Sequence, residues 1–461
     1  MSALWTTKDL EDATGGHAGG PIMAGGVSID TRTLQPGDLF VALVGDHTDG
    51  HAHVAAALEK GAAGAMVHDM TGLDTAGLLR VRDTQAALMD LGRFARVRFG
   101  GKTVAVTGSV GKTTTKEMLR VALSALGPTH AASASHNNHW GVPLTLSRLD
   151  PDATFCVCEI GMNHPGEIAP LAALAQPDVA VITTIAATHI GHMGSLDAIA
   201  REKAALVESL RPGGVAVIPA DAVGASGIAT RARAAGVRVI RFAGLESDAE
   251  ARLIALALEA DGSRFTALLD GTRIEVRLQA PGRHMAMNAL ACLAAVQGLG
   301  GDVRQAAEAL SNFRPGQGRG ALAPLLGGSA WLLDESYNAS GASVRAALEV
   351  LRLIPARRRV VVLGDMLELG EFACNEHLSL ITFVRESADI VYCCGDMMKN
   401  LFEILPREMQ GAYAPDSKAL APVVAAALLP GDLILVKGSY GSRMRDVVSA
   451  LTAATASGGP A

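Results

Sequence analysis

TGSVGKTTTKEM, the stretch from Thr107 to Met118, decides the fold of this 461-residue chain. An apolar run precedes it and a helical pattern follows it, which is the strand–loop–helix context that a phosphate-binding P-loop requires. Its glycines let backbone N–H groups approach phosphate oxygens, and the helix beginning near Lys112 points its partly positive end at the same oxygens. We therefore predict a nucleotide site formed by Gly108, Ser109, Val110, Gly111, Lys112, Thr113 and Thr114.

Two side chains of this loop suit the chemistry of a triphosphate. Lys112 can neutralise charge on the β- and γ-phosphates, and the hydroxyl of Thr113 can coordinate Mg²⁺.

The loop has Val106 where the general pattern GxxxxGK[ST] has glycine, and the shorter TGxxGKTT form belongs to a narrower set of proteins. Nucleotide binding alone leaves kinases, GTPases, motors and ligases open, although the absence of an NKxD motif after the loop counts against a GTPase.

The pattern on either side of the loop is that of α/β domains. Short apolar runs bounded by Gly, Pro or Asp alternate with helical patterns, which predicts parallel sheets covered on both faces. The runs lie at 102–108, 154–161, 178–185 and 214–219, and again at 331–335, 359–366, 389–395 and 432–439. A linker rich in glycine separates the two groups. The three predicted domains are a small mixed α/β domain (1–98), a central P-loop parallel-sheet domain (99–313) and a C-terminal Rossmann-like α/β domain (314–461).

Composition and charge exclude several classes of protein. Forty basic and 46 acidic residues give a net charge of −6, which argues against nucleic acid bound through a basic surface. Neither an apolar stretch of membrane-spanning length nor a signal-peptide pattern is visible in the sequence, so no membrane insertion is expected. The six cysteines have no CxxC spacing, and we predict buried, reduced thiols in a cytoplasmic protein.

Further segments resemble the Mur ligase family, in the family's order and across nearly the whole chain. The loop itself is similar to that of the Mur ligases and of folylpolyglutamate synthases. Tyr337-Asn338-Ala339 and VVLGDMLELG (361–370) favour the branch that adds D-alanyl-D-alanine over the branch that adds the third peptide residue, whose DNPR motif is absent. The other matching segments are VSIDTR (27–32), SHNNHWGVPLTL (135–146), CEIGMNHPGEI (158–168), THIGHMGSLDAIAREKAAL (188–206), GRHMAMNALACLAA (282–295), GQGRG (316–320) and LVKGSYGSRMRDVV (435–448).

The resemblance implies an ATP-dependent ligase that joins D-alanyl-D-alanine to UDP-N-acetylmuramoyl-tripeptide through an acyl phosphate; a monomer is expected. The implied ligands of two Mg²⁺ ions are Thr113, Glu159, His189 and a CO₂-derived carbamate on Lys203, and the implied catalytic residues are Lys112, Glu159, His189 and Lys203. The further implied ATP contacts are Asn288, Arg319, Asp334 and Asn338. The implied contacts to the UDP substrate are Ser28, Asp30, Thr31, Arg32, Asp49, Asn137 and Asn138, and those to D-alanyl-D-alanine are Lys437, Ser439 and Arg443.

Several of these residues have a second interpretation. Without the resemblance, Lys203 would be an ordinary solvated lysine on a helix. A group of three histidines, His47, His51 and His53, suggests a metal site, but we favour a polar ligand loop. A nucleotide-dependent regulator without ligase activity and a catalytically silent homologue remain as alternatives, and the intact catalytic set argues against the second. The residues that depart from the family's usual ones are Ser336, Ser340 and His192.

Overall fold

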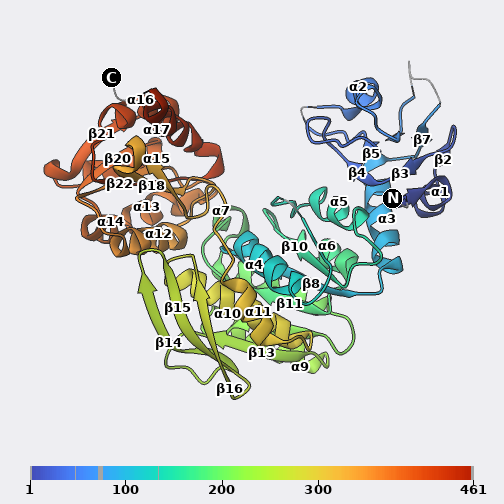
Figure 1. Ribbon diagram of the computed structural model, residues 1–461, viewed down its shortest axis with the longest axis horizontal. Helices are drawn as coiled ribbons and strands as arrows, with labels where there is room; N and C mark the ends of the chain where they lie inside the picture. The colour runs from blue at the N-terminus through green and yellow to red at the C-terminus, as the bar shows by residue number, and fades with distance from the viewer. Residues whose placement is uncertain (1–2, 47, 71–75, 133, 458–461) are drawn as a thin grey trace.

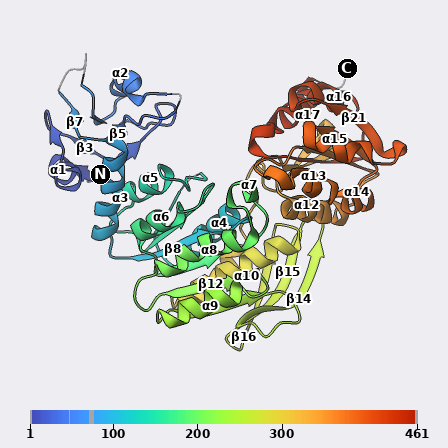
Figure 2. The same cartoon turned by 180° about the vertical axis from the view of Figure 1, so that it is seen from behind.

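The computed structural model describes residues 3–46, 48–70, 76–132 and 134–457. Its strands form one large sheet in each of three α/β units, beside a small sheet of two strands. The N-terminal and C-terminal units stand on opposite sides of the central unit (Figure 1), and the view from behind shows the same order (Figure 2). This arrangement confirms the predicted fold class. We keep 1–98, 99–313 and 314–461 as proposed domain limits.

The N-terminal unit is built on a five-stranded sheet in the order β2-β7-β6-β5-β4. Strands β4 to β7 pair in parallel, and β2 adds antiparallel to β7. Every residue of β5 and β6 is buried, which is the pattern of a parallel strand covered on both faces. The elements are β1 (Trp5–Thr6), α1 (Thr7–Thr14), β2 (His17–Ala18), β3 (Met23–Ala24), β4 (Gly26–Ser28), β5 (Asp38–Val41), η1 (Gly50–His53), α2 (Val54–Glu59), β6 (Gly64–Val67), β7 (Leu78–Arg80) and α3 (Thr84–Arg98).

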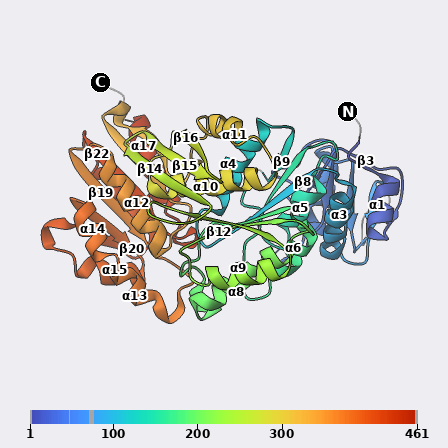
Figure 3. The same ribbon diagram turned by 90° about the horizontal axis from the view of Figure 1, so that it is seen from below.

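The central unit is a nine-stranded sheet in the order β16-β15-β14-β13-β12-β11-β8-β10-β9. The edge-on view shows α4, α10 and α11 on one face of this sheet and α8 and α9 on the other (Figure 3). The elements are β8 (Lys102–Thr107), α4 (Lys112–Ser124), β9 (Thr129–Ala131), α5 (Gly141–Ser147), β10 (Phe155–Glu159), α6 (Ile168–Ala175), β11 (Val179–Ile182), α7 (Ile190–Met193), α8 (Leu196–Glu208), β12 (Val215–Pro219), α9 (Ala225–Ala234), β13 (Arg238–Ala243), β14 (Ala251–Glu259), β15 (Gly262–Leu269), β16 (Thr272–Leu278), α10 (Arg283–Gly298) and α11 (Val303–Leu310).

The topology of this sheet places the P-loop at its middle. Strand β8 is the first strand of the unit, yet it lies between β11 and β10, which follow later in the chain. Ligands of open parallel sheets bind beyond the carboxyl ends of the strands at such a reversal of strand order. The predicted central strands are confirmed. The antiparallel extension β14 to β16 was not predicted: β15 and β16 mix polar and apolar residues, and the apolar run within β14 (253–258) does not by itself distinguish a strand from a buried helix.

The C-terminal unit is a six-stranded sheet in the order β17-β18-β22-β19-β20-β21, parallel except for the edge strand β17. Residues of α16 and α17 pack on one face, and those of α12, α14 and α15 pack on the other. The elements are β17 (Ala321–Leu325), η2 (Leu326–Gly328), β18 (Ala330–Glu335), α12 (Gly341–Leu353), β19 (Arg358–Gly364), η3 (Gly370–Phe372), α13 (Ala373–Leu378), α14 (Ile381–Ser387), β20 (Ile390–Cys394), α15 (Asp396–Glu403), η4 (Arg407–Met409), β21 (Gln410–Ala414), α16 (Ser417–Ala426), β22 (Asp432–Lys437), η5 (Tyr440–Ser442) and α17 (Arg445–Ser457).

Helix α5 joins the N-terminal unit to the central unit. The indole Nε1 of Trp5 donates to the carbonyl of Ser147 at 2.8 Å, and Arg148 Nε donates to the carbonyl of Val27. Trp140, just before α5, packs against the core of the N-terminal unit. These contacts fix the N-terminal unit against both ends of α5.

The cysteines test the prediction of buried, reduced thiols. Five cysteines are buried as predicted, but Cys374 is exposed on α13, so the prediction of six buried thiols is wrong for this one. Two apolar residues precede Cys374 and two polar residues follow it, and this mixed composition does not indicate which way its side chain points. Among the described residues, no helix combines the length and the apolar character needed to cross a membrane.

Candidate active site

The P-loop is tied to the residues that follow β11. Ser109 N donates to the carbonyl of Thr184 at 2.9 Å, and Ser109 Oγ donates to the carbonyl of Ala186 at 2.9 Å. The hydroxyl of Thr183 donates to the carbonyl of Val110 at 2.5 Å. Hydrogen bonds within the chain therefore fix the shape of the loop without a ligand. This preorganises the N–H groups that bind phosphate.

Two glycines of the loop are required by their surroundings. Gly108 has φ +151°, and a Cβ on it would overlap the hydroxyl of Thr183. Gly111, with φ +86°, precedes the first turn of α4, and a Cβ there would lie 2.7 Å from Asn288 Oδ1. Asn288 on α10, which the resemblance implies as an ATP contact, thus lies directly against the loop. Lys112 Nζ folds back to donate to the carbonyl of Gly108 at 2.9 Å.

Charged side chains from different elements meet beside this loop. Burial lowers the pKa of Lys112, Arg319 lowers it further, and the carboxylate of Glu159 opposes both effects. Glu159 ends β10 and is only 1% exposed. Its Oε1 accepts from Asn137 Nδ2 at 2.7 Å, whereas its buried Oε2 has no hydrogen-bond partner among the described residues. A buried carboxylate oxygen without a protein partner is a candidate ligand for a cation.

Lys203 is buried on α8, not solvated. Its side chain is 1% exposed, and burial is the main cause that holds its pKa well below 10.5. The positive charge of Lys112 lowers this pKa further, and Glu202 opposes the shift. A lysine in such surroundings has a neutral amine at a pH where ordinary lysines are protonated, and only the neutral amine can capture CO₂.

His189 lies at the boundary between the central and C-terminal units. It has φ +56°, and its Nδ1 contacts Oε2 of Glu368, which itself has φ +65°. Gly191 N donates to the carbonyl of Glu368 at 3.1 Å, so backbone and side chain join the same two segments. The contact with His189 is the main cause that lowers the pKa of Glu368. The unusual His192 lies against the ring of His164, with the ring centroids 4.6 Å apart.

Arg319 reaches from the linker to the P-loop region. Its guanidinium stacks over the ring of Tyr337 at 3.9 Å, and its Nη2 donates to Ser135 Oγ at 2.7 Å. Ser135 Oγ is also 3.0 Å from Thr113 Oγ1. Arg319, Lys112 and Thr113 are therefore brought together, and their sharing of one nucleotide stays a prediction.

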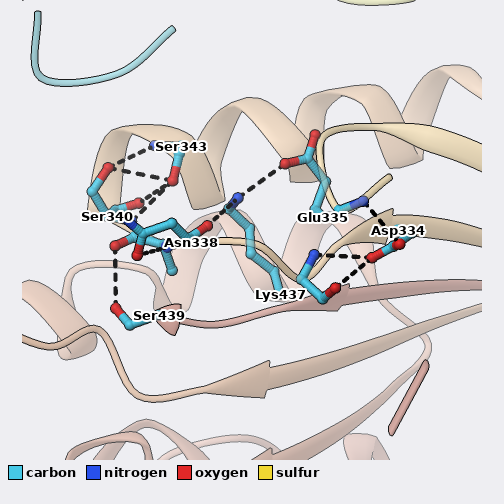
Figure 4. Close-up of polar contacts among 10 residues, drawn as sticks. Asp334, Glu335, Asn338, Ser340, Ser343, Lys437 and Ser439 are labelled. Carbon is cyan, nitrogen blue, oxygen red and sulfur yellow. Dashed lines mark hydrogen bonds and ion pairs between the residues drawn. The ribbon is translucent and has the colours of Figure 1, made fainter. Parts of the chain in front are cut away.

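The other predicted nucleotide residues of the C-terminal unit organise the loops around Arg319. Asp334 accepts from Gly318 N at 2.9 Å and from the hydroxyl of Ser336 at 2.6 Å. Asn338 Oδ1 accepts from Ala339 N at 2.9 Å. Ser340 is the N-cap of α12 and forms a capping box with Ser343 (Figure 4). The residues Ser336 and Ser340, which depart from the family pattern, thus have local structural roles.

The residues predicted to bind D-alanyl-D-alanine do not form one cluster. Lys437 is buried, and its Nζ donates to Glu335 Oε2 and to the carbonyl of Asn338, both at 3.0 Å (Figure 4). Ser439 Oγ accepts from Leu367 N at 2.9 Å. Arg443 is exposed, and its Nε pairs with Asp446 at 3.3 Å. Lys437 and Ser439 therefore support the loops around Asn338, and Arg443 lies outside this network.

On the N-terminal unit, the predicted UDP residues form two local groups. In the first, Asp30 binds the guanidinium of Arg32 through both oxygens, with 2.6 Å to Nη2, and this contact is the main cause that lowers the pKa of Asp30. Ser28 is fully buried and donates to the carbonyl of Asp30 at 3.1 Å, and the carbonyl of Thr31 accepts from Lys60 Nζ at 2.9 Å. Asp30 occupies Nε and Nη2 of Arg32, which leaves Nη1 of this exposed guanidinium for a diphosphate.

In the second group, Asp49 caps η1 and pairs with the ring of His51. Asp49 Oδ1 accepts from His51 N at 2.9 Å and lies 2.6 Å from His51 Nδ1. His51 Nε2 accepts from His68 N at 3.1 Å, so Nδ1 carries the proton. Separately, Asn138 Oδ1 accepts from Gly141 N at 2.9 Å at the start of α5. Of the three histidines named as an alternative metal site, His47 lies outside the described residues, His51 is paired as above, and His53 ends η1 with an exposed side chain.

The residues present suit a metal bound together with a nucleotide. Among the described residues, no three His, Cys, Asp or Glu side chains form a metal cluster by themselves. Ions held here would therefore need ligands beyond these residue types, and Thr113 and a modified Lys203 are of that kind. The unpartnered Glu159 Oε2 fits such a site. Two residues near the site, Ser135 and Glu368, were not predicted, although both lie inside segments that match the family.

Three family models match the chain, each over one of its units. They are the Mur ligase family catalytic domain (residues 24–91), the Mur ligase middle domain (106–296) and the Mur ligase glutamate ligase domain (327–440).

Individual relatives match over nearly the full length. The UDP-N-acetylmuramoyl-tripeptide–D-alanyl-D-alanine ligase of Escherichia coli K12 is 34% identical, over 97% of this chain and 98% of its own. The corresponding ligase of Synechocystis is 35% identical, over 93% and 92% of the two chains. A crystal structure of MurF from Acinetobacter baumannii is 29% identical, with a TM-score of 0.86 over 97% and 99% of the two chains. With a P-loop at the centre of its middle unit, this chain belongs to the Mur ligase family, among the UDP-N-acetylmuramoyl-tripeptide–D-alanyl-D-alanine ligases.

Proposed function

We propose that this chain joins D-alanyl-D-alanine to UDP-N-acetylmuramoyl-tripeptide at the expense of ATP, giving the UDP-linked pentapeptide precursor of peptidoglycan. The observation that carries the proposal is the meeting of Lys112, Glu159, Lys203 and Arg319 around one P-loop. Relatives named for this reaction match from end to end, which supports the same substrates here.

The reaction needs a charged site because a carboxylate does not react with an amine unaided. Transfer of the γ-phosphoryl group of ATP to the carboxylate of the tripeptide gives an acyl phosphate with a good leaving group. The amine of D-alanyl-D-alanine attacks the acyl carbon, and inorganic phosphate leaves. Lys112 and the N–H groups of the P-loop hold the phosphate oxygens whose charges would otherwise repel the carboxylate.

Two Mg²⁺ ions are part of the proposal, and their positive charge would stabilise the transferring phosphoryl group. Thr113, Glu159, His189 and a carbamate on Lys203 would hold them. In the conformation described here Nδ1 of His189 contacts Glu368, so Nε2 is the ring nitrogen that would bind an ion, with the carboxylate of Glu368 orienting the ring. Asn288, Arg319, Asp334 and Asn338 would then enclose the nucleotide from α10 and the C-terminal unit.

The test is to combine the purified chain with ATP, Mg²⁺, UDP-N-acetylmuramoyl-tripeptide and D-alanyl-D-alanine, and to measure phosphate release and product mass. We expect phosphate release that requires both substrates and a product of the mass of the UDP-pentapeptide. Release that instead requires a free amino acid and the UDP-dipeptide would identify the ligase that adds the third residue. No turnover with any muramoyl acceptor would reject ligation.

The amide of Asn338 is expected to contribute to ATP binding. Because Asn338→Ala removes one hydrogen-bonding group, the KM for ATP should rise about fivefold, the cost of a single hydrogen bond. The KM for D-alanyl-D-alanine should stay unchanged. The control is Asn400→Ala, which removes an exposed amide on α15 that donates to Met397. An ATP KM equal to that of the unmodified chain would reject the assignment.

A further inference from the structure

Ser135 has no role in the reaction described above, yet its hydroxyl lies between two residues that do. Its Oγ is 3.0 Å from Thr113 Oγ1 on α4 and accepts from Arg319 Nη2 at 2.7 Å. A serine hydroxyl has one donor and two acceptor positions. It can therefore accept from Arg319 and still donate its own hydrogen to an oxygen on the P-loop side.

The segment that carries Ser135 is fixed by the buried ammonium group of Lys116. Lys116 is fully buried, and its Nζ donates to the carbonyls of Ala132 at 2.6 Å and Ala134 at 3.1 Å. On the other side of Ser135, Asn137 is bonded to Glu159 at 2.7 Å. Ser135 is thus held at a defined place, which separates it from a surface serine that happens to touch an arginine.

Arg319 is equally well fixed on the C-terminal side. Its guanidinium lies over Tyr337, and Tyr337 N donates to the carbonyl of Gly318 at 3.1 Å. Gly318 N in turn donates to Asp334. The hydroxyl of Ser135 is therefore a polar link between a segment of the central unit and an ordered network of the C-terminal unit.

We propose that Ser135 is a positioning residue that directs Arg319 toward the nucleotide phosphates and so couples ATP binding to the C-terminal unit. The inference rests on the proposed function, because it takes the P-loop to bind ATP. Thr113 is proposed to hold Mg²⁺ through its hydroxyl oxygen, and its hydroxyl hydrogen can then be donated to Ser135 Oγ, which has two acceptor positions. Ser135 then has a free donor for a phosphate oxygen while it still accepts from Arg319.

The first test compares Ser135→Ala with Ser135→Thr, which keeps the hydroxyl. For Ser135→Ala we expect the KM for ATP and the calorimetric dissociation constant of ATP to rise about tenfold, the scale for a hydrogen bond to a charged group. The KM for D-alanyl-D-alanine should stay within about twofold, and Ser135→Thr should restore most of the ATP affinity. The matched control is Ser209→Ala, whose hydroxyl donates only to Ala205 one turn back on α8.

The second test asks whether Ser135 acts through Arg319. In an Arg319→Lys background, Ser135→Ala should add little to the loss of ATP affinity, because coupled residues are not additive. Multiplying effects, or equal ATP affinities of the unmodified chain and Ser135→Ala, would overturn the inference. Calorimetry does not need turnover, so a chain that binds ATP but forms no pentapeptide would reject the ligase function and leave this link open to test.

Discussion

Replacing Lys112 by methionine is expected to lower the kcat of ligation about 10³-fold, the scale for removing one preorganised charge-stabilising group from a reaction centre. Methionine keeps much of the length of the side chain but cannot neutralise charge on the β- and γ-phosphates. The backbone of the loop is held by Ser109, Thr183 and Thr184 independently of Lys112. The loss should therefore arise in the reaction and not in the fold.

Two measurements distinguish a loss of catalysis from a loss of folding in Lys112→Met. Phosphate release gives kcat, and thermal unfolding followed by circular dichroism gives the stability of the variant. The control is Lys102→Met, which removes a half-exposed ammonium that pairs with Asp178 at 3.4 Å at the opposite end of β8. A Lys112→Met variant with a normal unfolding midpoint and near-normal kcat would show that Lys112 does not act on the phosphates.

The parallel parts of the fold were predictable because they obey simple rules. A strand such as β8 is buried on both faces, so its sequence is a continuous apolar run, and Gly111 marks where α4 begins. The antiparallel extension was missed because β15 and β16 mix polar and apolar residues, and because the apolar run of β14 fits a buried helix as well as a strand.

For the candidate site, the sequence motifs identified individual residues but not the residues that they contact. The position of Lys203 on a helix suggested a solvated lysine unless the family resemblance was used, and burial by α8 packing is a property of the tertiary structure. The contacts of Ser135 with Arg319 and of His189 with Glu368 join segments far apart in the chain. Such contacts depend on how the three units pack against each other. The local periodicity of the sequence carries no information on that packing.

The buried position of Lys203 leads to the second large effect. Substitution of Lys203 by methionine is expected to lower kcat about 10²-fold, because the site loses the anionic group proposed to hold Mg²⁺. The fold should persist, since burial already penalises the charged ammonium at this position and methionine has no charge to bury. The matched control is Arg201→Met, which changes an exposed basic residue on the same helix.

A carbamate also has a signature that activity alone does not give. In the presence of ¹³C-labelled bicarbonate, the unmodified chain should show a carbamate carbonyl resonance in ¹³C NMR, and Lys203→Met should lack it. The carbamate forms from the neutral amine, so the low pKa of Lys203 favours it, and it is lost as the pH falls and the amine is protonated. Since Lys112 contributes to that low pKa, Lys112→Met should raise the pKa of Lys203 and weaken the same resonance. An undiminished carbamate signal in Lys203→Met would place the modification on another amine and reject a carbamate on Lys203.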